Sequence, residues 1–305
     1  MALVSTFAFV LAMLALGRGL AWRAVVGPDA AHTLNQVVLY ACLPAAILRH
    51  APKLSFEPAL LGIVAIPWIL VLVGALLVLG FAKWRALGRA ETAVLLLLCT
   101  LGNTSFLGFA VIPVLAGEAA LPHAVLYDQL GSFLQLSSFG VITLAVYGGD
   151  ARPSAAALVR RVVTFPPFLT LAAALTLVPA ELPAVVDGLL ARLEGALLPI
   201  AALAIGVQLR LAVPRSRISL LMLGLVTKLV LMPALALALC LALGLSGDMR
   251  AAAVFEAGMP GMITAAALLG SAKLAGDLAA ALVGYGIVVA MLTLPLWKWL
   301  LAVVG

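Results

Sequence analysis

A series of long apolar segments is the feature that most constrains how this chain folds. A helix needs about 20 mostly apolar residues to cross a bilayer, and short linkers with proline and glycine separate the segments. Hydrophobic residues make up 65% of the chain and charged residues 10%, whereas a soluble domain has roughly 25% charged residues. We therefore predict an all-α, polytopic membrane protein with ten transmembrane helices, at residues 2–17, 34–50, 59–82, 91–115, 121–148, 162–179, 184–208, 217–244, 250–271 and 278–303.

The basic residues predict how these spans are oriented. The formal net charge is +6, but the cations are scattered between apolar segments and do not form the clustered patch that binds nucleic acid. If the N-terminus lies outside, most cations fall in inside loops, as Arg18, Lys83 and Arg215 do, in agreement with the positive-inside rule. We predict a multi-pass protein of the inner or plasma membrane, surrounded by lipid bilayer, with both termini outside and no nucleic-acid partner.

The two halves of the chain share landmarks in the same order. The segment 39–44 ends in Leu-Pro, and so does the segment 195–199; Pro67 in the third span has a counterpart at Pro233 in the eighth. Five spans is an odd number, so a second copy must enter the membrane upside down. We predict two inverted repeats, residues 1–150 and 151–305, an organisation common among alternating-access transporters. Chance placement of prolines, which membrane helices tolerate, is the alternative.

Two spans carry residues that interrupt a helix. In the fourth span the interruption covers residues 102–113, which begin Gly-Asn-Thr-Ser, and in the ninth it covers 258–261, which read Gly-Met-Pro-Gly. Half-helix N-termini attract anions, and half-helix C-termini present carbonyls to cations. We interpret the two breaks as a transport site. The alternative is a pair of kinks that allow close helix packing.

Three ionisable residues fall inside predicted spans, where charges are costly and mark functional sites. Glu256 stands about one turn before the ninth-span break, Asp128 lies in the fifth span and Lys228 in the eighth. We predict that Glu256 and Asp128 couple transport to an ion, and the alternative for both carboxylates is a solvated helix end. Lys228 can pair with Glu256 or Asp128 or contact an anionic substrate, and a packing ion pair is its alternative.

The sequence contains no complete catalytic motif of the enzyme classes that we considered. Residues 244–247 read Gly-Leu-Ser-Gly, a pattern of serine intramembrane proteases, but no histidine follows His123 to act as the base. The chain has no HExxH or Walker sequence, and Cys42, Cys99 and Cys240 lie singly in apolar segments rather than at metal-ligand spacing. We predict no enzyme and no cofactor or metal, with a proton or a sodium ion as coupling ion. A channel or a membrane-embedded small-molecule sensor is the alternative function.

Several landmarks together resemble the auxin efflux carrier family, especially its bacterial members, over essentially the whole chain. The residues that carry the resemblance are Leu39-Tyr40-Ala41-Cys42-Leu43-Pro44-Ala45, Gly102-Asn103-Thr104-Ser105-Phe106-Leu107-Gly108, Tyr127-Asp128, Leu198-Pro199 through Gly206, Met259-Pro260 and Thr293-Leu294-Pro295-Leu296-Trp297. One departure is that the family usually has Gly-x-Pro in the fourth span, where this chain reads Gly108-Phe109-Ala110 and has Pro113 three residues later.

The resemblance implies a fold similar to that of bile-acid and sodium symporters, with the fourth and ninth helices broken and crossing near the midplane. It also implies elevator-type transport of an organic anion, such as auxin, malonate or another carboxylate. A homodimer is a further expectation. The residues assigned from the two breaks and the charges inside the spans are Asn103, Thr104, Ser105, Pro260, Gly261 and Thr264 for substrate binding; Glu256, Asp128 and Asn103 for ion coupling; and Gly102, Gly108, Pro113, Gly258 and Pro260 for the helix breaks.

Overall fold

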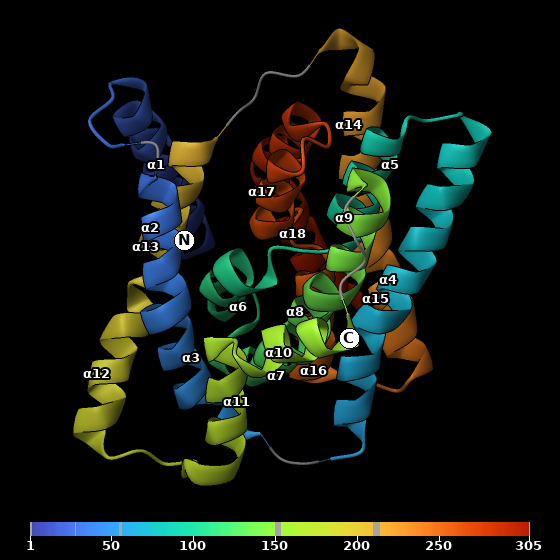
Figure 1. Cartoon of the computed structure of the whole chain (residues 1–305). Helices are drawn as coiled ribbons and strands as arrows, with labels where there is room; N and C mark the ends of the chain where they lie inside the picture. The colour runs from blue at the N-terminus through green and yellow to red at the C-terminus, as the bar shows by residue number, and fades with distance from the viewer. Residues whose placement is uncertain (1, 28, 55–56, 150–153, 210–213, 305) are drawn as a thin grey trace.

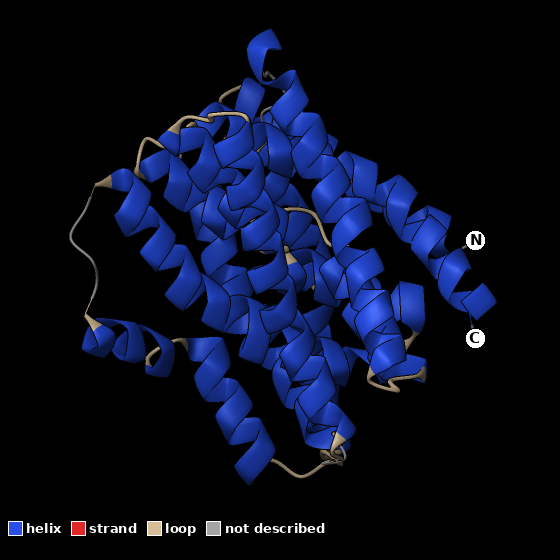
Figure 2. Cartoon of the chain, turned by 90° about the vertical axis from the view of Figure 1, so that its right-hand side faces the viewer, coloured by secondary structure: helices blue, strands red, loops and turns tan. Residues whose placement is uncertain are grey.

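The computed structural model is helical throughout its described part, which comprises residues 2–27, 29–54, 57–149, 154–209 and 214–304 (Figure 2). Within these ranges the only β-type pairing is one isolated bridge. Seven helical stretches are long and apolar enough to cross a membrane: Ser5–Trp22, Ala30–Lys53, Ala59–Trp84, Glu118–Gly148, Ala184–Gln208, Arg215–Ala242 and Gly276–Val304. The protein is therefore an all-helical, multi-pass membrane protein.

The seven long stretches overlap seven of the ten predicted spans. The other three predicted spans, 91–115, 162–179 and 250–271, are made of shorter helices separated by non-helical residues. They are α5 (Arg89–Thr100) with α6 (Phe109–Ala116), α10 (Ala155–Val163) with α11 (Pro166–Leu177), and α16 (Gly247–Ala257) with α17 (Ile263–Ser271). Because these helices fall short of a bilayer's thickness individually, the count of ten spans and the inverted repeat stay predictions.

One group of helices, which we call the first body, forms the left-hand side of Figure 1. Here α1 packs along α13, α13 also packs against the helix that follows α1, and α3 packs against α11 and α12. Its elements are α1 (Ala2–Trp22), α2 (Ala30–Val37), the π-helical turn η1 (Val38–Cys42), α3 (Leu43–His50), the 3-10 turn η2 (Ala51–Lys53), α11, α12 (Ala184–Gly195) and α13 (Leu197–Gln208).

Two glycines allow the backbones of α1 and α13 to approach closely. A Cβ added at Gly17 would lie 2.9 Å from the backbone nitrogen of Val207, and one added at Gly206 would lie 2.9 Å from the Cα of Leu14. Small residues at helix contacts serve this purpose in membranes, where no hydrophobic effect drives helices together.

We expect Gly17→Ala to destabilise the first body, because the new methyl group meets backbone atoms that cannot rotate away. Overpacking of this kind costs about 1–3 kcal/mol, measured as a lower melting temperature of the purified protein in detergent. Gly19→Ala is the matched control on the same helix, since nothing lies within 4 Å of its Cβ position. Equal melting temperatures for the two variants would contradict this account of the contact.

The remaining helices, apart from α10, form the second body, in which α4 packs against α5, α15 against α16 and α17 against α18. Its elements, besides α5, α6, α16 and α17, are α4 (Ala59–Trp84), η3 (Thr104–Gly108), η4 (Glu118–Ala120), α7 (Leu121–Leu126), η5 (Tyr127–Ser132), α8 (Phe133–Gln135), η6 (Leu136–Gly140), α9 (Val141–Gly148), η7 (Arg215–Arg217), α14 (Ile218–Val226), η8 (Thr227–Leu231), α15 (Met232–Ala242) and α18 (Gly276–Val304). Of these short elements, η3, η5, η6 and η8 are π-helical.

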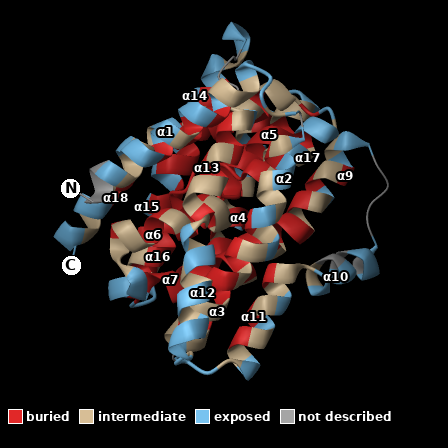
Figure 3. Ribbon diagram, turned by 90° about the vertical axis from the view of Figure 1, so that its left-hand side faces the viewer, coloured by how far each residue is buried: buried red, intermediate tan, exposed pale blue. Residues whose placement is uncertain are grey.

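The short helices α5 and α16 lie in the interior of this second body. All residues from Thr92 to Thr100 on α5 and from Ala252 to Ala257 on α16 are buried, and Figure 3 shows the buried residues gathered in the middle of the molecule. Non-helical backbone is tolerated at membrane depth only where protein or a wet cavity surrounds it. This burial therefore permits two interrupted helices in the interior of the protein.

Candidate functional site

Two non-helical segments, 101–103 and 258–262, meet in the interior and pair as extended chains. Gly102 and Gly261 form an antiparallel bridge. The amide of Asn103 donates to the carbonyl of Pro260 at 2.7 Å, and the amide of Met262 donates to the carbonyl of Leu101 at 3.0 Å. These bonds replace the helical hydrogen bonds that both chains lose, as buried backbone requires. We call this meeting point the crossing.

The first break, 101–103, lies at the start of the predicted interval 102–113, and the second, 258–262, covers the predicted interval 258–261. Gly102 lies in the first break, and Gly258 and Pro260 lie in the second. Gly108 and Pro113 do not break their helix, because helical structure runs without interruption from Thr104 to Ala116. A proline removes a single intrahelical bond, and a buried helix absorbs that loss. The first break is fixed instead by pairing with the second segment.

Four half-helices end or begin at the crossing. In Figure 1, α6 and α16 lie below α5 and α17, so that α5 leads down to the crossing and α6 leads away from it. The helix that contains η3 and α6 begins at Thr104, and α17 begins at Ile263. The first amides of a helix have no intrahelical partner and carry partial positive charge. Two such N-termini therefore point their free amides toward the same region.

A cavity of about 250 Å³ lies beside these N-termini, between the two bodies. No lysine or arginine is among the described residues that line it. The second body contributes Asn103, Thr104, Ser105, Phe106, Phe133, Leu136, Met262, Ile263, Thr264 and Ala267, and the first body contributes His32, Asn35, Gln36, Leu39, Leu43, Phe165 and Gln208. Of the residues predicted for substrate binding, Pro260 and Gly261 do not line the cavity but form the paired backbone behind it.

A second, larger cavity of about 920 Å³ adjoins the first, with which it shares Gln208, Ile263 and Ala267. Its lining includes Arg18 near the end of α1 and Ser271 at the end of α17. Both helix ends lie at the top of Figure 1, the end of the molecule at which our topology places the inside loops. The small cavity is therefore reached from the cation-rich end.

Asn103 is a buried polar side chain at the crossing whose polar atoms have no hydrogen-bond partner in the described part of the chain. It is 1% exposed, and neither its amide nitrogen nor its carbonyl oxygen has a hydrogen-bond partner among the described residues. A buried, unsatisfied polar group costs about 1–3 kcal/mol, so its retention calls for a physical reason. Its position on the cavity wall makes a bound ligand a suitable partner.

Asp128 is fully buried and holds the hydroxyl groups at the start of the η3–α6 helix. Its carboxylate accepts hydrogen bonds from Thr104, from Ser105 at 2.6 and 2.7 Å, and from the side-chain nitrogen of Gln129 at 2.6 Å. It is therefore not the solvated helix end that was the alternative from sequence. Asp128 lies on the π-helical turn η5, and such turns frequently occur at functional sites.

Glu256 is also fully buried, at the C-terminal end of α16, so it is not an interfacial residue. Neither carboxylate oxygen has a hydrogen-bond partner among the described residues. The carboxylate lies against Gly108, where an added Cβ would lie 2.6 Å from its Oε1. Asp128 and Lys228 are its charged neighbours. Gly108 thus makes space for this carboxylate, a role distinct from the helix break predicted for it.

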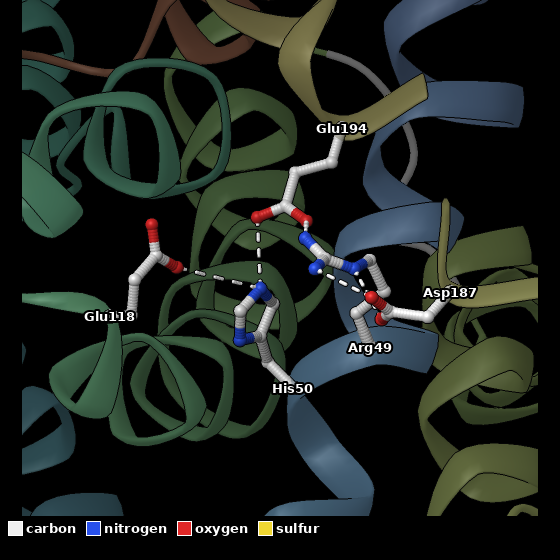
Figure 4. Close-up of polar contacts among 5 residues, drawn as sticks. All are labelled: Arg49, His50, Glu118, Asp187 and Glu194. Carbon is white, nitrogen blue, oxygen red and sulfur yellow. Dashed lines mark hydrogen bonds and ion pairs between the residues drawn. The ribbon is translucent and has the colours of Figure 1, made fainter. Parts of the chain in front are cut away.

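A separate charged cluster lies where the first body meets η4 of the second body, and Figure 4 shows its five side chains. Arg49 on α3 binds Asp187 on α12 at 2.9 Å and also binds Glu194 on the same helix. His50 contacts Glu194 at 2.9 Å and lies 3.9 Å from Glu118 of the second body. Three of these groups could surround a metal ion. Both carboxylate oxygens of Glu194, however, already have protein partners, so the cluster is satisfied as an ion-pair network.

The part of the cavity wall that the first body contributes was not predicted from the sequence. His32, Asn35, Gln36 and Leu39 line the cavity from α2 and η1. Asn35, Gln36 and Leu39 follow His32 by three, four and seven residues, so all four lie on one helix face. Three of the four are polar in an otherwise apolar segment, and this pattern could have indicated the cavity wall. Gln208, the last residue of α13, lines both cavities.

Comparisons with known proteins agree with this architecture. A family model described as membrane transport protein, the auxin efflux carrier-like family, matches residues 2–150 and 151–298. A protein named as an uncharacterized transporter from Methanothermobacter thermautotrophicus is 27% identical over 293 residues, which cover 95% of each chain. These similarities indicate a transport role rather than catalysis.

Proposed function

The chain belongs to the membrane transport protein family, and from this premise we propose that it is a secondary transporter that carries a small organic anion across the cell membrane. The observation that carries the proposal is the pair of half-helix N-termini beside a cavity of about 250 Å³. Typical pockets for drug-sized ligands measure roughly 300–1,000 Å³, so this cavity suits a small carboxylate such as malonate more than a large molecule.

The electrostatics of the cavity favour an anion. The free amides at Thr104 and Ile263 attract negative charge, as helix N-termini do for phosphates and carboxylates. Asn103 and Thr264 add side-chain donors that are able to hydrogen-bond a carboxylate, whereas the hydroxyl of Ser105 already donates to Asp128. Since no lysine or arginine is among the described residues that line the cavity, we propose that recognition depends mainly on these dipoles.

Movement between the two bodies provides alternating access in this proposal. The cavity is lined by residues of both bodies, so a displacement of the second body along the first carries the crossing from one membrane face toward the other. The adjoining larger cavity at the cation-rich end corresponds to access from the inside. The ion-pair network of Arg49, His50 and Glu194 then lies on the closed, outer side. A proton or sodium gradient drives the cycle.

Uptake into liposomes tests the proposal. We expect purified protein in liposomes to accumulate at least one labelled mono- or dicarboxylate from a panel that includes malonate and an auxin, with saturable kinetics and dependence on an imposed ion gradient. Empty liposomes are the control. Single-channel currents without saturable uptake would instead support a channel, and binding without either activity would support a sensor.

A further inference from the structure

Lys228 brings a fixed positive charge into the crossing. It lies on the π-helical turn η8, in the middle of the apolar stretch Arg215–Ala242, and is 4% exposed. Its Nζ donates a hydrogen bond to the carbonyl oxygen of Ala257 at 2.6 Å. A lysine buried in a membrane segment is costly and needs partners that carry negative charge.

Ala257 is the last residue of α16, so its carbonyl belongs to the negative end of a half-helix. The last carbonyls of a helix lack intrahelical partners and carry partial negative charge. In transporters with interrupted helices, such carbonyl ends coordinate the driving cation. In this structure the ammonium group of Lys228 already occupies that position, with the carboxylate of Glu256 as a charged neighbour.

The ammonium group also fills the available space. A Cβ added at Gly102 would lie 3.1 Å from Nζ and 3.4 Å from the adjacent Cε of Lys228. The lysine side chain therefore packs directly against the first break while its nitrogen binds the end of the half-helix before the second break. One side chain thus contacts both breaks, and its bond to Ala257 is charge-assisted, which makes it stronger than a neutral hydrogen bond.

We propose that Lys228 is the resident cation of the crossing, and that the transport cycle consequently requires no sodium ion at the carbonyl end of α16. The inference rests on the proposed transport function. It narrows that proposal, which allowed either a sodium or a proton gradient as the driving force. An ammonium group and a sodium ion would compete for the same carbonyl oxygen and the same carboxylate neighbour, and the ammonium group is covalently tethered.

The first test is the sodium response of the wild-type protein and needs no transported substrate. We expect the melting temperature of purified protein in detergent to be the same in sodium chloride and in choline chloride of equal concentration. A melting temperature that rises with sodium and saturates would overturn the proposal. Because this measurement does not involve uptake, a failure of the liposome assay leaves its result interpretable.

Variants of Lys228 provide the second test. We expect Lys228→Ala to lower the melting temperature in choline chloride by at least about 5 °C, because the Ala257 carbonyl and Glu256 lose their cation, and we expect sodium chloride to recover part of this loss. Lys228→Met keeps more of the side-chain volume if the alanine variant does not fold. Lys83→Ala, at an exposed lysine outside the crossing, is the control. Lysine variants as stable as wild type in both salts would contradict the assigned role.

Discussion

Replacement of Asn103 by alanine is expected to weaken substrate binding by about 10- to 100-fold. An uncharged group that hydrogen-bonds a carboxylate contributes about 1.5–3 kcal/mol, and each 1.4 kcal/mol corresponds to a tenfold change in affinity. The side chain lines the cavity and has no hydrogen-bond partner among the described residues. Removing the side chain therefore changes the stability of the free protein little, but it removes a direct hydrogen bond to the bound substrate.

The measurement is the concentration of labelled carboxylate at half-maximal uptake, together with the melting temperature of the same preparation. We expect the first to rise and the second to remain within a few degrees of wild type. Thr170→Ala is the control, because its hydroxyl only bonds the Pro166 carbonyl of its own helix and it does not line the described cavity. An unchanged half-maximal concentration in Asn103→Ala would remove this residue from the binding site.

The sequence predicted the two interrupted helices because glycine and proline are strong local signals. Gly258, Pro260 and Gly261 occur within four positions, and the structure places the second break there. Pro113 carried a similar signal and was misleading, because it lies inside a continuous helix. The difference is tertiary. A segment leaves the helix where another segment offers replacement hydrogen bonds, and the segment 101–103 finds these bonds in the segment 258–262.

Contacts between residues that are distant in the sequence could not be predicted from local sequence patterns. Lys228 had several possible partners on sequence grounds, and its contact to the Ala257 carbonyl depends on how α15, η8 and α16 pack. The π-helical turns that carry Asp128 and Lys228 were equally unforeseen. Such turns shift the helix face by a fraction of a turn, so a regular helical wheel does not place these side chains correctly.

The boundary between buried and interfacial charge also depended on tertiary structure. Glu256 stands only a few residues from the start of α16, and a sequence count therefore left it close to the membrane surface. The surrounding α4, α6, α7, α15 and α18 enclose α16, so the carboxylate is fully buried. Depth in a membrane protein is set by the neighbours of a helix as much as by position along it.

Replacement of Glu256 by glutamine is expected to abolish gradient-driven accumulation of substrate while exchange of substrate across the membrane continues. Glutamine has the shape of glutamate, but it neither releases a proton nor offers a negative charge to a cation. The fully buried carboxylate has no hydrogen-bond partner among the described residues, so the substitution breaks no structural bond. The substitution removes the carboxylate, which we propose binds and releases the coupling ion during the cycle.

Two assays on the same liposomes separate coupling from binding. In the first, the wild-type protein concentrates labelled carboxylate when the driving gradient is imposed, and Glu256→Gln is expected to bring the internal concentration only to the external level. In the second, liposomes preloaded with unlabelled substrate take up label by exchange, and both proteins are expected to do so at rates within about tenfold of each other. Glu181→Gln, at an exposed residue between α11 and α12, should match wild type in both assays. If Glu256→Gln still concentrates substrate against its gradient, the coupling ion binds elsewhere, and Asp128, the other buried carboxylate beside the crossing, becomes the group to test.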